Sequence, residues 1–149
     1  MAAEKTRRII LNADDKAGYS IYGLASPEAD YKLSLALNAT RRYNLRLDEP
    51  VKLGIIPGKG EIIFPRFSDL SLLPHSWATL IVNRSDNQFL VKKPANIDFL
   101  FITPEENPGQ SIVEMQLTLL RSKGLITGFF RIEADLIDRE ILDKALPRH

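Results

Sequence analysis

Apolar and polar residues alternate over several short stretches of the chain, which is the pattern of β-strands with one buried face. The clearest early stretch is 19–25, which is rich in Ile, Tyr and Leu and follows a turn-like sequence at 14–18. Two later stretches, 77–83 and 97–103, are apolar on both faces, which indicates central strands covered on both sides. The pattern predicts strands at 8–11, 19–25, 51–56, 61–67, 77–83, 97–103 and 125–133.

Two other segments carry apolar residues at helical spacing. The first is predicted to span 31–43, after the helix-opening sequence Ser26-Pro27-Glu28, and to end at Asn44. The second is predicted to span 112–123, after a capping sequence at 107–110, and Gly124 closes it. A short helix is predicted at 138–145. The residues expected to be buried are Leu33, Ala36, Leu37 and Thr40 on the first helix, and Ile112, Met115, Gln116, Leu119 and Leu120 on the second.

The sequence Pro57-Gly58-Lys59-Gly60 separates the strands predicted at 51–56 and 61–67. Adjacent proline and glycine favour a tight reversal, so these strands are expected to form a hairpin. The order strand, helix, strand occurs on both sides of this strand-rich middle. We therefore predict one α+β domain over residues 1–149. Its sheet is mixed but mostly antiparallel, with two main helices packed on one face, split βαβ units around a β-meander, and a short C-terminal helix.

The composition is that of an ordinary globular protein. Of the 149 residues, 44% are hydrophobic and 26% are charged, and the formal net charge is +1. Proteins that bind DNA through many phosphate contacts usually carry a larger basic excess, so dedicated DNA binding is not expected. No apolar run has the length of a membrane span, and the charged residues 1–8 precede no apolar region of signal-peptide length. These features predict a cytoplasmic protein and leave its oligomeric state open.

The sequence contains no recognisable motif for catalysis or metal binding. It has no cysteine, which excludes disulfides, thiolate nucleophiles and cysteine-ligated metals. Its two histidines, His75 and His149, are not spaced as a ligand pair, and no nucleotide-binding glycine motif or nucleophile elbow occurs. His75, beside Trp77, is a candidate general base, but a packed or solvated loop residue is the favoured interpretation. We predict no catalytic residue, no metal site and no cofactor.

Three polar residues lie within otherwise apolar segments. Asp98 interrupts the strand predicted at 97–103, Asn83 ends the strand before it, and Asn38 lies on the first predicted helix. A buried carboxylate or amide is costly unless it is hydrogen-bonded or paired. We interpret these side chains as ties between loops and backbone. The alternative, contact with a ligand or partner, is left open by the sequence.

Arg41, Arg42 and Arg46 cluster around the C-terminal end of the first predicted helix. Basic side chains complement the helix dipole there, so a solvated face is the simpler interpretation. The other interpretation is a patch that contacts an anion or an RNA backbone. The candidate residues for contact with a partner or ligand are thus Asn38, Arg41, Arg42, Asn83 and Asp98.

Three segments resemble one family in their order and spacing. The segment Asp30-Tyr31-Lys32-Leu33-Ser34-Leu35-Ala36-Leu37-Asn38 is similar to the helix signature of the IPExxxVDY family, an uncharacterised family from Bacteroidetes. The segments 80–85 and 97–100 resemble its Asn-containing strand and its VDY strand. Val91-Lys92-Lys93 stands where that family has IPE, and Phe99 stands in place of the tyrosine. The family name records a pattern, so the resemblance implies no reaction.

These observations favour a non-catalytic interaction protein that presents its first helix or an exposed sheet face to a protein or ribonucleoprotein partner. A small-ligand binding or regulatory domain is the alternative, since a sheet of this type can hold a ligand against one face. An enzyme of unrecognised type is the third hypothesis.

Overall fold

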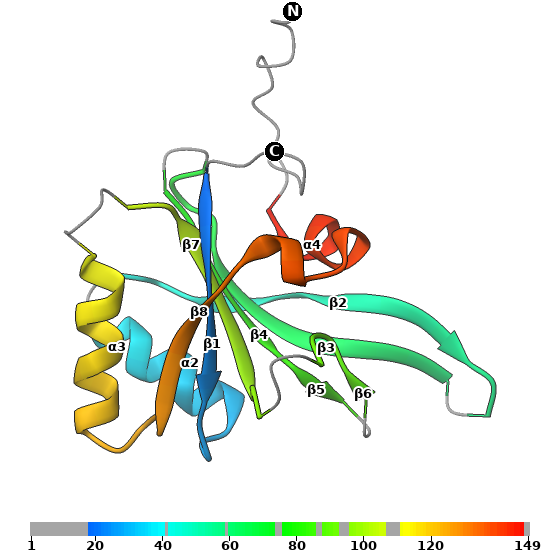
Figure 1. The fold of residues 1–149 in the computed structure, drawn as a ribbon, viewed down its shortest axis with the longest axis horizontal. Helices are drawn as coiled ribbons and strands as arrows, with labels where there is room; N and C mark the ends of the chain where they lie inside the picture. The colour runs from blue at the N-terminus through cyan, green and yellow to red at the C-terminus, as the bar shows by residue number, and fades with distance from the viewer. Residues whose placement is uncertain are drawn as a thin grey trace, which may run out of the picture.

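The computed structural model describes residues 18–40, 42–58, 60–73, 76–85, 88–92, 96–106 and 111–147, and Figure 1 shows its fold. Six strands form one sheet in the order β2-β3-β4-β7-β1-β8. They are β1 (Tyr19–Ala25), β2 (Arg46–Ile56), β3 (Gly60–Asp69), β4 (Ala78–Val82), β7 (Phe99–Pro104) and β8 (Gly128–Ile132). A small separate ribbon pairs β5 (Arg84–Ser85) with β6 (Gln88–Phe89). The helices are α2 (Asp30–Asn38), α3 (Ile112–Ser122) and α4 (Arg139–Ala145), with a 3-10 turn η1 (Ala134–Leu136) before α4.

The α+β class predicted from the sequence is confirmed, and so are the meander and one of the predicted split βαβ units. Strands β2, β3, β4 and β7 follow one another as a meander. The unit β7-α3-β8 is a split βαβ unit, because β1 lies between β7 and β8 and runs antiparallel to both. In β1-α2-β2, by contrast, the helix connects two strands that lie four places apart in the sheet. Every strand pair in the described sheet is antiparallel, so the parallel neighbours that a mixed sheet requires do not occur there.

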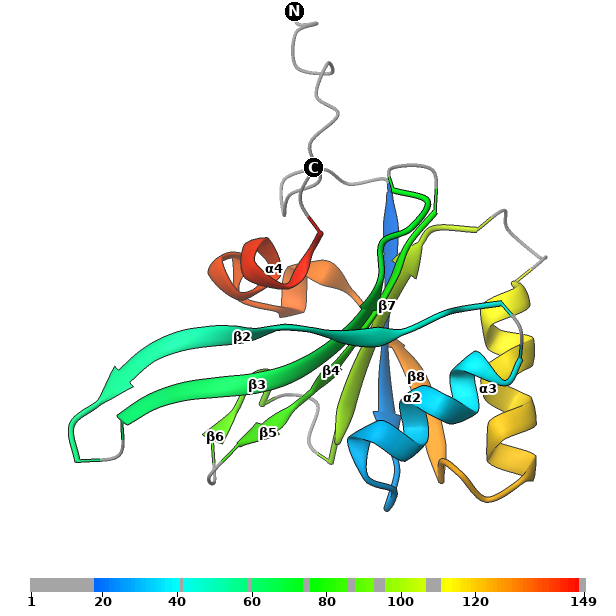
Figure 2. The same cartoon turned by 180° about the vertical axis from the view of Figure 1, so that it is seen from behind.

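The two faces of the sheet carry separate cores, and different helices cover them. On one face, Leu33 and Leu37 of α2 and Leu117 of α3 pack with Leu80 and Phe101 of the sheet. The prediction of two main helices on one face is therefore confirmed. The opposite face is covered by α4 and by the segment that precedes β7, which pack over a core of Phe64, Trp77, Ile81, Ile97, Leu100 and Leu142. Figure 2 shows α4 on one side of the strands and α2 and α3 together on the other.

The central strands and the first described strand match the predicted pattern. Strand β1 has the predicted bounds. Strands β4 and β7 pair with each other in the middle of the sheet, and nearly all their residues are buried. Apolar residues on both faces of these segments are explained by the two cores, since each strand contributes to both.

The helix predicted at 31–43 is shorter in the structure. It ends at Asn38, and its N-cap is Ala29; Ser26 Oγ instead accepts a hydrogen bond from the Glu28 amide. Leu33 and Leu37 are buried as predicted, and Ser34 joins them, whereas Ala36 and Thr40 are only partly buried. Asn44 lies beyond the helix, where its amide N–H donates to the Asp69 carboxylate. The chain leaves the helix early because Asn38 binds the backbone of Leu45, as described below.

Helix α3 is rotated relative to the prediction. Its N-cap is Ser111, whose Oγ accepts a hydrogen bond from the Glu114 amide at 3.0 Å, and Gly124 follows its end at φ +78°. The buried residues are Val113, Leu117 and Leu120. Of the predicted stripe, Leu120 is buried and Gln116 partly so, whereas Ile112, Met115 and Leu119 are exposed. Because α3 is apolar on two sides, helical spacing did not identify the side that packs.

The predicted hairpin is present as β2 and β3. Gly58 and Gly60 both have positive φ, which the reversal needs and which glycine adopts without strain. The pairing shifts register between Asp48 and Val51 and again between Lys52 and Gly54, so β2 carries two bulges. The hairpin extends beyond the part of β3 that pairs with β4, and it projects from the sheet (Figure 1).

Some predictions fall on residues that the structure does not describe. They are the strand at 8–11, the capping sequence at 107–110, Arg41, His75 and His149.

Candidate interaction site

Asn83 is fully buried directly after β4, and its amide holds the segment between the β5-β6 ribbon and β7. Its Nδ2 donates to the carbonyl oxygens of Val91 and Ile97, each at 2.9 Å, and its Oδ1 accepts from the Val91 amide at 2.7 Å. Its backbone N–H donates to the Asp98 carbonyl at 2.9 Å. The side chain is 0% exposed. It is therefore positioned to order this segment and not to reach a partner at the surface.

Asp98 is half-buried directly before β7 and has a partner for each carboxylate oxygen. Oδ2 accepts from the Ser26 amide at 2.9 Å, and Oδ1 is bound by the Arg84 guanidinium. Arg84 also lies over the ring of Phe89, with its Cζ 5.4 Å from the ring centroid. Asp98 thus joins the end of β1 to the β5-β6 ribbon.

Asn38 binds a different segment from Asn83 and Asp98. Its Nδ2 donates to the Leu45 carbonyl at 3.0 Å, and its Oδ1 accepts from the Leu45 amide at 2.7 Å. This two-point contact closes the connection from α2 to β2 and buries Leu45 in the core under the helices. The three polar residues are paired in the way that the loop-tying interpretation requires, and they do not meet in one hollow.

Only part of the predicted basic cluster falls within the described residues. Arg42 is exposed and follows α2, and Arg41 lies outside the described residues. Contact of these arginines with a partner therefore stays a prediction. Next to them, Tyr43 is partly buried; its hydroxyl donates to Gln116 Oε1 at 2.8 Å, and its ring packs edge-on against Phe101. Burial raises the pKa of Tyr43 to about 12.

The outer surface of α2 and α3 exposes large apolar side chains that sequence reasoning assigned to the core or did not single out. Tyr31 and Leu35 on α2 are 58% and 62% exposed, and Met115 on α3 is 71% exposed. Ile112 and Leu119 flank Met115 at helical spacing and are also exposed. Both helices are thus apolar on their packed side and on their solvent side. The signal was present in the sequence as a helix with two apolar stripes, which is unusual for a surface helix.

The projecting hairpin adds apolar residues on the same side of the sheet. Leu47 pairs with Phe67, which packs in the core under α2 and α3, and Ile63 lies four residues before Phe67 on that strand face. Leu47 is 76% exposed and Ile63 is 39% exposed, and with Pro50 they line a shallow, open hollow. Leu47 and Ile63 therefore add exposed apolar side chains to the sheet face that α2 and α3 cover.

Arg66, on the opposite face of β3, fixes α4 to the hairpin and was not identified from the sequence. Its Nε donates to the Glu49 carbonyl at 2.8 Å, and its Nη1 donates to the carbonyls of Lys144 and Ala145 at 3.1 and 3.4 Å. These last two carbonyls belong to the C-terminal end of α4, where a cation complements the helix dipole. Burial lowers the pKa of Arg66, and the Asp48 and Glu49 carboxylates oppose that shift.

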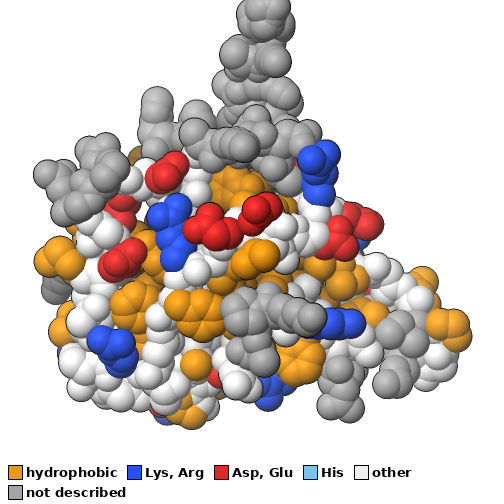
Figure 3. Space-filling view, viewed as in Figure 1, with side chains coloured by type: hydrophobic (Ala, Val, Ile, Leu, Met, Phe, Trp, Pro, Cys, Tyr) orange, Lys and Arg blue, Asp and Glu red, His pale blue; other side chains and the backbone are white. Residues whose placement is uncertain are grey.

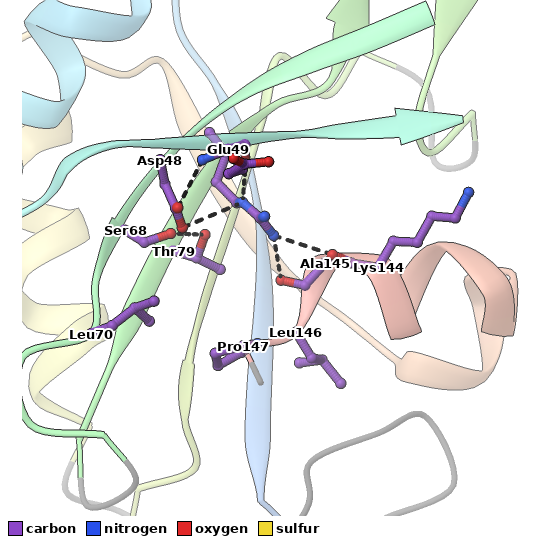
Figure 4. Close-up of a pocket in the computed structure, with 10 residues that line it drawn as sticks. Asp48, Glu49, Ser68, Leu70, Thr79, Lys144, Ala145, Leu146 and Pro147 are labelled. Carbon is purple, nitrogen blue, oxygen red and sulfur yellow. Dashed lines mark hydrogen bonds and ion pairs between the residues drawn. The ribbon is translucent and has the colours of Figure 1, made fainter. Parts of the chain in front are cut away.

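A hollow of about 200 Å³ lies beside Arg66, between β3 and the end of α4. Figure 4 shows Asp48 and Glu49 on one side of it and Lys144 and Ala145 on the other. At its floor Ser68 Oγ and Thr79 Oγ1 are hydrogen-bonded to each other at 2.9 Å. Arg66, Ser68 and Thr79 of this hollow already have hydrogen-bond partners, and Asn38, Asn83 and Asp98 do not line it.

Within the described residues, no group of three or more His, Cys, Asp or Glu side chains is placed to hold a metal ion. None of the described helices has the length and apolar character needed to cross a membrane.

Comparison with known proteins gave no further assignment: no family model, no curated protein and no solved structure matches this chain. The resemblance to the IPExxxVDY family stays a prediction from the residues that carry it.

Proposed function

We propose that this protein is a non-catalytic interaction protein that binds a protein, alone or within a ribonucleoprotein, through the outer surface of α2 and α3. The cytoplasmic location expected from the sequence is part of this proposal.

The observation that carries the proposal is the second apolar stripe on each of the two helices. Isolated apolar side chains are normal at protein surfaces, but a row of them along one side of a helix is typical of a contact surface. Tyr31 and Leu35 are one turn apart on α2, and Ile112, Met115 and Leu119 lie on one side of α3. Tyrosine and methionine are enriched at the centres of protein interfaces.

Small-ligand binding is less well supported. Pockets for small ligands usually enclose about 300–1,000 Å³ and offer polar groups that the protein itself leaves free. The hollow beside Arg66 is smaller, at about 200 Å³, and the hydroxyls of Ser68 and Thr79 already bind each other. The hollow at Leu47 and Ile63 is larger, at about 660 Å³, but it is shallow and does not enclose a ligand. This alternative is therefore not proposed.

The test is affinity capture under gentle lysis with the full chain and two variants of matched exposure. Met115→Glu places a charge in the α3 stripe, whereas Leu136→Glu places one in the η1 turn, where Leu136 is 65% exposed. We expect a partner that the wild type and Leu136→Glu retain and that Met115→Glu loses. Recovery of no specific partner by the wild type, or the same partner with all three proteins, would contradict the proposal.

A further inference from the structure

Strand β8 forms one edge of the sheet and is regular along its whole length. It pairs with β1 without a shift in register, and it contains no proline. Within the described part of the chain, no side chain binds the outer edge of β8. Proteins usually protect such an edge with bulges, proline, charge or a covering segment. Of these protections β8 has the charge of the exposed Arg131 but, within the described residues, no bulge, proline or covering segment, so its regular backbone edge is available for pairing with another strand.

The hydrogen bonds of β1 determine which backbone groups of β8 point outward, away from the sheet. The Leu24 carbonyl accepts a hydrogen bond from Asp98 at the β7 side of β1, whereas the Ala25 carbonyl accepts one from Thr127 at the β8 side. Because the direction alternates along a strand, Gly23 also bonds toward β8, where it faces Phe130. Phe130 thus points its N–H and C=O toward β1, and Phe129 and Arg131 point theirs outward.

These outward groups fit a second copy of β8 in one antiparallel register. When Phe130 lies opposite Phe130 of the second copy, Phe129 lies opposite Arg131 in both directions, and all four outward groups of each strand form hydrogen bonds. If the axis passed through Arg131, the arginines of the two copies would lie opposite each other. If it passed through Phe129, the pairing would require the N–H of Thr127, which already donates to the Ala25 carbonyl. In the favoured register Arg131, whose guanidinium is 3.8 Å from the Glu105 carboxylate of its own chain, lies next to Phe129 of the other copy, and a guanidinium beside an aromatic ring is an attractive pair.

The side of α3 nearest β8 is also complementary to itself. Arg121 lies over the ring of Phe129, with its Cζ 5.5 Å from the ring centroid. Glu114, seven residues earlier, accepts a hydrogen bond from the Tyr22 hydroxyl at 3.1 Å, and Tyr22 pairs with Arg131. A twofold axis through Phe130 exchanges the Phe129 end of β8 with the Arg131 end. It therefore brings Arg121 of each copy toward Glu114 of the other.

We propose that the outer edge of β8 pairs with the same edge of a second copy of this chain, around a twofold axis at Phe130. The sheet becomes continuous through the dimer, and the α3 helices lie next to each other across the axis with two Arg121–Glu114 pairs. A second copy fits better than an unrelated peptide, because both the strand register and the flanking charges are complementary to themselves. Figure 3 shows the side that carries β8, with apolar side chains exposed among acidic and basic ones.

Sedimentation equilibrium of the full chain over a wide concentration range tests the strand pairing. We expect a reversible dimer of micromolar affinity, as is typical of a small interface. Arg131→Pro removes an outward N–H that makes no bond to β1, so the fold is retained while the dimer is lost. Arg131→Ala keeps that N–H and should retain the dimer within a few-fold. A wild type that is monomeric throughout, or an Arg131→Pro variant that dimerises like the wild type, would overturn the proposal.

A charge exchange tests the same dimer without touching the strand. Arg121→Glu places two acidic side chains on the α3 flank, and Glu114→Arg places two basic ones there. Each variant alone should dimerise at least tenfold more weakly than the wild type, because like charges face each other across the axis. An equal mixture should form a heterodimer at least as tight as the wild type, since both pairs are then opposite in charge. A mixture no tighter than its components would rule out this arrangement, and circular dichroism of each variant checks that it is folded.

Discussion

The two edge strands of the sheet, β2 and β8, differ in how their outer backbone groups are protected against pairing with another strand. At the β2 edge, Pro50 removes a backbone donor, two register shifts interrupt the ladder, and the Lys144 ammonium binds the Lys52 carbonyl at 2.9 Å. At the β8 edge there is no proline or register shift, and Phe129 and Arg131 point unbonded backbone groups outward. The longer strand thus has three kinds of protection against pairing that the shorter one lacks. In Figure 1 β8 lies toward the viewer, and in Figure 2 β2 does.

This difference restricts strand pairing between copies to one edge of the sheet. A sheet with two open edges would polymerise, because each copy could accept strands on both sides. Closing β2 and leaving β8 open limits strand pairing to a closed twofold dimer. The long hairpin of β2 and β3 can then expose its side chains to a partner, while the backbone edge of β2 is protected against strand pairing.

The largest predicted effect is on the free energy of unfolding, through the buried Asn83 in the interior between the two edges. Asn83→Ala leaves the Val91 amide and the Val91 and Ile97 carbonyls without their side-chain partner, and we expect a loss of about 3 kcal/mol in the free energy of unfolding. Urea denaturation measures this loss. Asn44→Ala, at an exposed asparagine, is the control and should change stability by less than about 0.5 kcal/mol. Equal losses in the two variants would contradict the anchoring role of Asn83.

The next largest effect is that of Arg66, and it tests whether the β2 side and the β8 side of the sheet behave independently. Arg66→Ala removes three hydrogen bonds that hold α4 and the Glu49 carbonyl, so we expect a loss of about 2 kcal/mol in the free energy of unfolding and faster amide exchange in α4. The dimer dissociation constant of the folded protein should not change, because Arg66 is remote from β8 in strand order. Arg46→Ala, exposed on β2, serves as the matched control. Loss of the dimer in Arg66→Ala alone would show that the two edges are coupled.

A pH titration tests the packing of Tyr43, where the chain enters β2. Its pKa is raised to about 12, above the ordinary value of 10.0, so the folded state favours the neutral phenol. The resulting stability is present below pH 10 and is lost as the pH rises through 12, with a decrease of about 1 kcal/mol between pH 9 and pH 11. Tyr43→Phe should reduce that decrease in urea denaturation at both pH values. An unchanged pH dependence in Tyr43→Phe would contradict this assignment.

The smallest effect probes the closed edge itself. Lys144→Met frees the Lys52 carbonyl and should cost at most about 1 kcal/mol, because the lost hydrogen bond is exposed. Pro50 and the register shifts remain, so the variant should gain no new self-association. We expect the double variant Lys144→Met and Arg131→Pro to sediment as a monomer. A dimer in this double variant would mean that the lysine alone had closed the β2 edge.

The sequence allowed much of the fold to be predicted, because strong local patterns coincide with burial. The bounds of β1 and the hairpin at Gly58 follow from alternation and turn residues, and the two-sided apolar strands β4 and β7 are central as expected. The packed side of α3 was predicted wrongly, since Met115 and Leu117 are equally apolar and tertiary packing chooses between them.

The candidate site was less predictable, because its contacts join residues distant in sequence. Asn83 and Asp98 stood out as polar residues within apolar segments, but Arg66 resembles any cation on a half-exposed strand. Its acceptors on α4 lie 78 and 79 residues away. The local pattern of a sequence does not give the order of the strands in a sheet. That β8 is an edge strand therefore follows from the structure alone.

Amide hydrogen exchange at β8, followed as a function of protein concentration, tests the difference between the edges most directly. The N–H groups of Phe129 and Arg131 should exchange rapidly in dilute protein and slowly in concentrated protein, while Phe130 and the β2 amides change little. Exchange of Phe129 and Arg131 at the same rate across the whole concentration range would contradict an edge that pairs with its own copy.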